Sequence, residues 1–578
     1  MPDDILKRLD SILTRERIEN SPDRDLIYLL VSALEELSTK YDKLYEAHLQ
    51  LRDDYNHLIG EQGRPDIAKK GKGGSGKNHS SEKERSKGNS SGKGRGKRNH
   101  KVEIHQTKIC PVNKEELPSD AIFKGYSEVI IQDILIRPNN TKLLLEKYYS
   151  PSEKKTYFAK RPEGYDGDFG PEIKTAVIEG KAIYGMSENA IFNFFKNHGT
   201  FISQSTISRK LIQNNDSFHD ESKDILKAGI GASDFLQTDT TGANVNGVQY
   251  NTHIFSNSYF TAFRTGAKKD RISTIRHIIG NLENKYLFND SAFQLLFNFK
   301  IAKKWIKKIR NLVYSLCLSE SELKEKLSEI FGLDGFETLK KRVTEAGLIA
   351  YYWSQKEYPV PKILLTDDAP QYDNIAEEHQ LCWVHEARHY KKLRPKTTLM
   401  KEVHKYFMDK FWGFYNEMLA YTNSPSPEFA LKIEEQFKAL FGGKTEYKDL
   451  NLRIEKTYKK MGALLTFVRY PNIPLHNNDA ELGARAQVRY RDVSLFTRNE
   501  KGTKAVDTYL TIVKTAKKLD LNPSNYISGL IRGDVDHRSL AEIIAWKSQK
   551  ATADDRKDDN YNTEAKKMGF SQCTVRSA

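Results

Sequence analysis

Cysteine and long apolar runs are both scarce in this chain, and each absence excludes a class of protein. Only four cysteines occur among 578 residues, and none stands in a Cys-x-x-Cys pair. The sequence therefore supports neither a disulfide framework nor a four-cysteine zinc module, and it is typical of a reducing compartment. No run approaches the roughly 18 apolar residues that a membrane-spanning helix needs, and the opening MPDDILKRLD lacks the order of a signal peptide. We expect a soluble cytoplasmic protein without a membrane partner.

Negative charge is also in deficit. The net charge is +15 and the pI is about 9.2, which favours a polyanionic partner such as nucleic acid. Residues 69–101 hold twelve Lys/Arg against two Glu, on a Gly/Ser background without apolar residues. Such a composition does not offset the entropy lost on ordering. Residues 61–104 are therefore predicted to form a flexible basic linker that binds phosphates non-specifically. A solubilising tether is the alternative.

A leucine heptad is the first regular pattern along the chain. Leucines recur every seven residues, at Leu30, Leu37, Leu44, Leu51 and Leu58. Sustained seven-residue spacing predicts a coiled coil. We therefore expect residues 1–60 to pair subunits into a homodimer or a higher homo-oligomer. A single amphipathic helix packed on the rest of the protein is the alternative.

Three short helical segments begin near Gly170. They read PEIKTAVIEGKAIY, GMSENAIFNFFKNHG and FISQSTISRKLIQN, with Ser187 suited to begin the second and Gly199 to end it. The third helix would present five polar or basic side chains on an exposed face: Gln204, Ser205, Ser208, Arg209 and Lys210. This order is typical of a helix-turn-helix, so residues 170–230 are predicted to bind DNA. A plain helical packing domain has the same spacing.

Strand patterns follow the helices. The segments DFLQTDTTG, NGVQYNTHIFSN and YFTAFRTG are joined by short turns, and Asn246-Gly247 suits a type I′ hairpin. Two further strands are expected at PKILLTDDAP and LCWVH. Long helical stretches interrupt the pattern at about 287–352 and 396–470. The sequence predicts a multidomain α+β protein whose core is a mixed five-stranded sheet with large helical insertions.

Three carboxylates stand out by their position. Asp239 ends the first predicted strand, Asp367 ends the fourth, and Glu481 lies one turn into a later helix. If these strands are neighbours, the two Asp repel each other unless a cation lies between them. Oxygen ligands of this kind suit Mg²⁺ or Mn²⁺. Structural explanations also exist, because Asp is a common turn residue and Asn478-x-x-Glu481 is a passable capping box.

The segment CWVHEARHY contains Cys382 and His385 at the spacing of a zinc-ligand pair. A zinc site would need two more ligands, and neither His379 nor His389 has a compelling spacing. We expect no zinc. Cys382 is instead predicted to be a small buried residue of the fifth strand, with His385 hydrogen-bonded near the active site.

Taken together, these segments resemble the DDE transposases of the insertion-sequence-66 family. LQTDTTG matches the family's first Asp, TDDAPQY and CWVHEARHY match its second Asp and the Cys-x-x-His that follows, and HNNDAELGAR matches its Asn-Asn-x-x-Glu segment. The resemblance extends from about Gly170 to Ile527. Three departures are visible: Cys110 is all that remains of the family's paired-cysteine zinc motif, and His476 and Leu482 replace an Asp and an Arg beside the Glu.

The resemblance implies a ribonuclease H-like catalytic core over residues 231–530. Asp239, Asp367 and Glu481 would hold two divalent ions, Mg²⁺ or Mn²⁺, with Asp368 as the substitute for Asp367. It also implies cleavage and strand transfer at the ends of a mobile element in a bacterial nucleoid. The partners would be terminal inverted repeats, target DNA and accessory proteins encoded by the same element. Three arginines would hold DNA phosphates: Arg485, Arg489 and Arg491.

The remaining segments complete the expected organisation. Residues 105–169 would replace the family's zinc-binding motif, and residues 531–578 would form a C-terminal helix and a polar tail. Three other functions remain open from the residues alone. They are a non-catalytic DNA-binding regulator or domesticated transposase relic, a coiled-coil scaffold, and a metal-dependent nuclease that cuts without joining.

Overall fold

The computed structural model describes residues 21–58, 103–113, 117–162, 165, 167–280, 283–534 and 537–555. The predicted basic linker at 61–104 lies almost wholly outside the described residues, as do the first twenty residues of the predicted coiled-coil segment and most of the predicted polar tail. Among the helices of the described part, none is both long and apolar enough to cross a bilayer.

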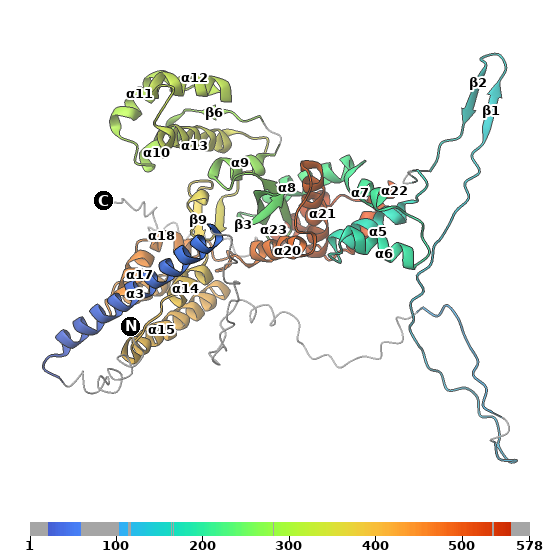
Figure 1. Cartoon of the computed structure of the whole chain (residues 1–578), viewed down its shortest axis with the longest axis horizontal. Coiled ribbons are helices and arrows are strands. Elements are labelled where there is room, and N and C mark those ends of the chain that lie inside the picture. The colour runs from blue at the N-terminus through green and yellow to red at the C-terminus, as the bar shows by residue number, and fades with distance from the viewer. Residues whose placement is uncertain are drawn as a thin grey trace.

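A five-stranded sheet forms the centre of the described chain (Figure 1). Its strands are β3 (Phe235–Val245), β4 (Val248–Ser256), β5 (Thr261–Gly266), β8 (Ile363–Thr366) and β9 (Glu378–Leu381). They lie in the order β5-β4-β3-β8-β9, where β3, β4 and β5 are antiparallel neighbours and β8 and β9 run parallel to β3. The mixed five-stranded sheet that the sequence predicts is therefore confirmed.

The turn between β3 and β4 has the predicted geometry. Asn246 has φ 51° and Gly247 has φ 83°, and positive φ at both central residues is the signature of a type I′ turn. The turn sets the register of the hairpin, in which Asp239 lies opposite Ile254.

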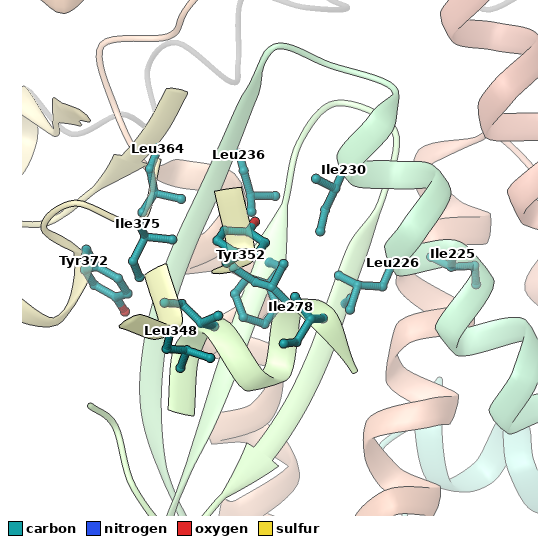
Figure 2. Close-up of a cluster of buried hydrophobic side chains, with 14 of the residues drawn as sticks. Ile225, Leu226, Ile230, Leu236, Ile278, Leu348, Tyr352, Leu364, Tyr372 and Ile375 are labelled. Carbon is teal, nitrogen blue, oxygen red and sulfur yellow. The ribbon is translucent and has the colours of Figure 1, made fainter. Parts of the chain in front are cut away.

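Helices cover both faces of the sheet. On one face, α8 (Asp216–Gly231), α9 (Arg271–Ile279) and α13 (Glu337–Ser354) bury a large apolar cluster that includes Leu226, Ile278 and Tyr352 (Figure 2). On the other face, Ile254 and Phe263 pack against α20 (Asn478–Ser494) and α21 (Glu500–Lys518). Because cross-strand partners point to the same face, Asp239 shares the α20 face with Ile254.

Helix α21 also protects the edge of the sheet at β5. The backbone N–H groups of Thr261, Phe263 and Thr265 donate to side chains of α21: Thr515 Oγ1 at 3.2 Å, Thr511 Oγ1 at 3.1 Å and Asp507 Oδ2 at 2.7 Å. Two residues along a strand and four along a helix both advance about 6–7 Å. The two spacings match, so an edge that would otherwise expose unpaired donors is closed.

The predicted insertions at about 287–352 and 396–470 are both helical. The first comprises β6 (Tyr286–Leu287), α10 (Asp290–Asn298), α11 (Lys303–Val313), β7 (Cys317–Leu318), α12 (Glu320–Phe331) and α13. The second comprises α15 (Thr398–Asn423), α16 (Pro427–Phe441), α17 (Lys448–Tyr458), α18 (Met461–Leu464) and α19 (Thr466–Arg469). The short β6–β7 ladder was not expected, because two-residue strands leave no periodicity in the sequence.

The N-terminal helix α3 (Arg24–Leu58) docks on the second insertion (Figure 1). Tyr28 and Val31 join the apolar core of that insertion. The carboxylate of Glu35 accepts from the backbone N–H groups of Lys396 and Thr397, at 2.8 and 2.6 Å, just before α15 begins. The heptad leucines point elsewhere: Leu30, Leu37, Leu44 and Leu51 are 61–71 % exposed. One face of α3 therefore packs on the second insertion, whereas the heptad leucines remain exposed on another face of the helix.

The three helical segments predicted from Gly170 onward are present as α5 (Pro171–Ala182), α6 (Glu188–Asn197) and α7 (Gln204–Ile212). Ser187 caps α6 by accepting from Ala190 N at 3.1 Å. Upstream, residues 103–162 contain a single described hairpin, β1 (Lys147–Ser150) with β2 (Lys155–Phe158). Downstream, α22 (Pro523–Arg532) packs on α5 and α23 (Leu540–Asp555) packs on α8.

The expectation that Lys210 lies on the exposed face of α7 is wrong. Lys210 is 8 % exposed, and its ammonium lies 5.8 Å from the ring centroid of Phe169. The reason is helical geometry, because Lys210 is three residues after the buried Ile207 and therefore shares its face.

Candidate active site

Asp239 and Asp367 lie at the same level of the sheet. The parallel register of β3 and β8 pairs Gln237 with Leu365, and two residues further along each strand bring Asp239 level with Asp367. The prediction that Asp239 ends its strand is wrong, because β3 continues to Val245 in its pairing with β4. Only β8 ends here, so both acids still occupy the rim where the parallel pairing stops.

The residue after Asp367 has a different environment. Asp367 follows β8 directly, and its Oδ1 accepts from Ala369 N at 3.2 Å. Asp368 forms an ion pair with Lys460, the residue directly before α18. A carboxylate neutralised by a lysine is less available to a metal, so the geometry favours Asp367 over Asp368 as the partner of Asp239.

Glu481 reaches the same region because the start of α20 is fixed to β3. The Asn477 side chain donates to Thr238 O at 2.8 Å, and Asp479 N donates to Gln237 Oε1 at 3.1 Å. Both acceptors belong to the two residues before Asp239. Close packing requires a glycine, since a Cβ on Gly483 would lie 2.6 Å from Ile254 Cγ2. The capping-box interpretation of Glu481 is wrong, because α20 has no side-chain cap hydrogen bond.

The negative charges of Asp367 and Glu481 both act on Asp239. The pKa of Asp239 is raised to about 6, first because the side chain is buried, and further by the negative charges of Asp367 and Glu481. A hydrogen bond from Thr240 N, at 2.7 Å to Asp239 Oδ1, and the positive charge of Arg388 oppose this rise. A buried acid whose pKa is raised by two neighbouring negative charges lies in surroundings that suit a cation.

Two basic side chains of α14 (Trp383–Lys391) contact Glu481. Arg388 Nη2 donates to Glu481 Oε2 at 3.0 Å, and Arg388 Nη1 lies 2.8 Å from His385 Nε2. His385 Nε2 lies 3.7 Å from Glu481 Oε1. The sequence reasoning placed His385 near the site but did not single out Arg388. The spacing in the sequence could have identified Arg388, because it follows His385 by three residues and therefore shares its helix face.

The expectation that Cys382 belongs to the fifth strand is wrong. β9 ends at Leu381, and Cys382 is the residue before α14. The following residues take helical geometry because Trp383, Ala387 and Tyr390 form an i, i+4, i+7 stripe that is buried in the core of the second insertion. Cys382 itself is buried, as predicted.

Cys382, His385 and Glu481 nevertheless offer ligand atoms within 4.8 Å of one another. Zinc binds the thiolate rather than the thiol. Burial raises the pKa of the Cys382 thiol to about 11, and its sulfur already accepts from Asn477 N at 3.3 Å. The three-atom cluster is therefore poorly suited to zinc, whereas the trio of carboxylates offers the hard oxygen ligands that Mg²⁺ and Mn²⁺ prefer.

The residues predicted to contact DNA lie on two helices, α7 and α20. On α7, Gln204, Ser205 and Arg209 are exposed and Ser208 is half-buried. On α20, Arg485 and Arg489 are exposed, beyond the turn that carries Glu481. Arg491 is engaged within the protein, because its Nη1 donates to Gly242 O at 2.6 Å.

Comparisons with known proteins match the part of the chain that carries two of the three acids. Residues 354–505, which contain Asp367, Arg388 and Glu481, match the Transposase IS66 family. An uncharacterized protein of Sinorhizobium fredii (strain NBRC 101917 / NGR234), y4jO, is 29 % identical over 330 residues. That match covers 57 % of this chain and 100 % of the relative.

Proposed function

We propose that this chain, which carries the transposase domain of the IS66 family over residues 354–505, binds the ends of a mobile DNA element and catalyses their cleavage and strand transfer. The observation that carries the proposal is the convergence of Asp239, Asp367 and Glu481 from β3, the end of β8 and α20. The register of β3 and β8 and the contact of Asn477 with Thr238 support it, and the raised pKa of Asp239 is consistent with it.

The strand order supports a ribonuclease H-like core for residues 231–530, with the two helical insertions as additions to it. In this core Asp239, Asp367 and Glu481 would hold two divalent cations. Such ions, when bound, activate a water or a DNA 3′-hydroxyl and stabilise the leaving oxygen. The chain's own contribution is to hold the three carboxylates on one rim, through the Asn477 contact with Thr238 and the packing of Gly483 on Ile254.

Two further surfaces complete the proposal. The exposed side chains of α7 would contact the terminal repeats, and Arg485 and Arg489 would contact DNA phosphates near the acids. The heptad row of α3 would pair with the same row of a second copy. This pairing is supported by the exposure of Leu30, Leu37, Leu44 and Leu51 on a helix whose other face is already packed.

The test uses the purified full chain, Mg²⁺ and linear DNA that carries the element ends. Wild type should nick the ends and join them to a target plasmid. Asp239→Asn should bind the same DNA and should lose both reactions by at least about 100-fold, the loss expected when several kcal/mol of metal-dependent stabilisation disappear. Binding without cleavage by the wild type would identify a non-catalytic DNA-binding protein instead. Cleavage without joining would identify a nuclease.

A further inference from the structure

The first helical insertion carries a concentration of positive charge that the catalytic site does not use. Residues 291–319 contain six Lys/Arg and no Asp or Glu. Five of the six belong to α11, and Lys300 lies three residues before it. All six are exposed: Lys300, Lys303, Lys304, Lys307, Lys308 and Arg310. We call the five lysines of this set the α11 patch.

The α11 patch lacks the internal ion pairs that its neighbour has. In α12, Lys324 pairs with Glu320 at 3.2 Å and Lys326 with Glu329 at 3.1 Å. In the part of the chain that the structure describes, no carboxylate lies within ion-pair distance of any lysine of the α11 patch. Only Arg310 is paired, with Asp290 at 3.2 Å. A solvated helix face usually mixes both signs of charge, and this one does not.

The apolar side of α11 is already occupied. Ile301, Ile309 and Val313 are buried in the main core, and the Trp305 ring packs on Phe331 and Phe336 with centroids 4.9 and 5.2 Å apart. A helix that binds a membrane surface needs a free apolar face to enter the lipid. Since α11 has none, its charge fits a polyanion rather than a bilayer.

The lysines are spaced and supported for contact with phosphates. Lys303 and Lys307, like Lys304 and Lys308, are four residues apart, or about 6 Å along the helix. The Trp305 ring lies under the ammonium groups of Lys304 and Lys308, at 5.4 and 5.1 Å from its centroid. Cation–π contact holds these flexible side chains on the outer surface of the helix.

The insertion is fixed to the catalytic rim rather than loosely attached to it. Arg271, at the start of α9, forms a buried ion pair with Glu345 of α13 and donates to the carbonyls of Asp373 and Pro370, each at 2.8 Å. Those carbonyls belong to the segment just after Asp367. Figure 1 shows α10, α11, α12 and α13 grouped beyond α9, away from the sheet.

We propose that the α11 patch binds the phosphate backbone of duplex DNA. The proposal rests on the proposed function, because the duplex it takes is the DNA that the acids act on. Binding here would hold that DNA outside the catalytic rim, without reading its sequence.

The experiment measures binding of a 40-base-pair duplex by the full chain in EDTA over a series of salt concentrations. One variant carries Lys303→Gln, Lys304→Gln, Lys307→Gln and Lys308→Gln. Its matched control carries Lys324→Gln, Lys326→Gln, Lys432→Gln and Lys459→Gln, four helix-surface lysines that each pair with a Glu. Both variants lose the same net charge.

The patch variant should show a slope of log K against log[salt] that is smaller by about 3–4, and affinity reduced at least about 10-fold. The control should keep nearly the wild-type slope. A second patch variant with Lys→Arg at the same four positions should bind as wild type does. Equal slopes for the Gln patch variant and the control would overturn the proposal, as would a loss of binding to anionic vesicles with DNA binding unchanged. Because the readout needs no metal, Asp239→Asn should bind with the wild-type slope, which separates this result from a failure of catalysis.

Discussion

The guanidinium of Arg388 donates to both carboxylate oxygens of Glu481, at 3.2 and 3.0 Å. A protein cation thus neutralises one of the three acids, and the same carboxylate cannot fully serve an arginine and a metal ion. The two interactions compete.

Removal of the Arg388 side chain, which competes with a metal ion for Glu481, should strengthen metal binding. For Arg388→Ala we expect the apparent Mg²⁺ affinity to rise several-fold, because Glu481 is released from a charge-assisted hydrogen bond of about 1.5–3 kcal/mol. Calorimetric titration of the DNA-free chain with Mg²⁺ measures this affinity. Arg388→Lys, which keeps the charge and loses the fork of donors, should fall between the two. An affinity lowered by Arg388→Ala would contradict the competition.

The two neighbouring aspartates should differ in their effect. Asp367→Asn should abolish cleavage as Asp239→Asn does, since it removes a carboxylate whose charge acts on Asp239. Asp368→Asn breaks only the ion pair with Lys460, which is partly exposed and contributes about 1 kcal/mol or less. It should therefore keep cleavage within about fivefold of wild type, as measured in the same Mg²⁺ assay. Inactivity of the Asp368 variant alone would reverse the assignment.

Gly483→Ala should displace α20 from the sheet. Its added Cβ would meet Ile254 Cγ2 at 2.6 Å, and overpacking of this kind costs about 1–3 kcal/mol. We expect a lower urea midpoint and slower cleavage, because Glu481 moves with the helix. The double variant Gly483→Ala, Ile254→Ala opens space at the contact and should show a destabilisation smaller than the sum of the two single changes. If the two destabilisations simply added, the close approach of Gly483 to Ile254 would not be the cause of the loss in stability.

Acid should destabilise the fold through His277. Its pKa is lowered to about 3, mainly by burial and further by the charges of His253 and Arg264. An unfolded chain takes up this proton near pH 6.5. Protonation therefore favours the unfolded state, and the free energy of unfolding falls as the pH drops from about 6.5 towards 3, by about 2 kcal/mol from this group between pH 7 and pH 5.

Urea unfolding at pH 7 and pH 5 tests whether His277 causes this loss of stability in acid. His277→Gln should lose less stability on acidification than the wild type, whereas His105→Gln, an exposed residue of the upstream segment, should lose as much. Equal losses in all three proteins would show that His277 does not carry the acid sensitivity.

Local elements could be read from the sequence because they depend on neighbouring residues. The Asn246-Gly247 pair determines its turn through positive φ, and Ser187 determines the start of α6 through its own hydroxyl. The apolar runs predicted strands at β3 and β8, with Asp367 directly after β8. For these features the chain needed no distant partner.

The tertiary structure decided which face each element shows and which partner each charge finds. Arg388 reaches Glu481 because α14 and α20, 93 residues apart at this contact, pack together, and Cys382 precedes a helix because Trp383 has a core to enter. Whether the heptad side of α3 packs inward or outward also depended on the second insertion. Burial and Coulomb energies depend on distances in space, and a residue's neighbours along the chain leave these distances undetermined.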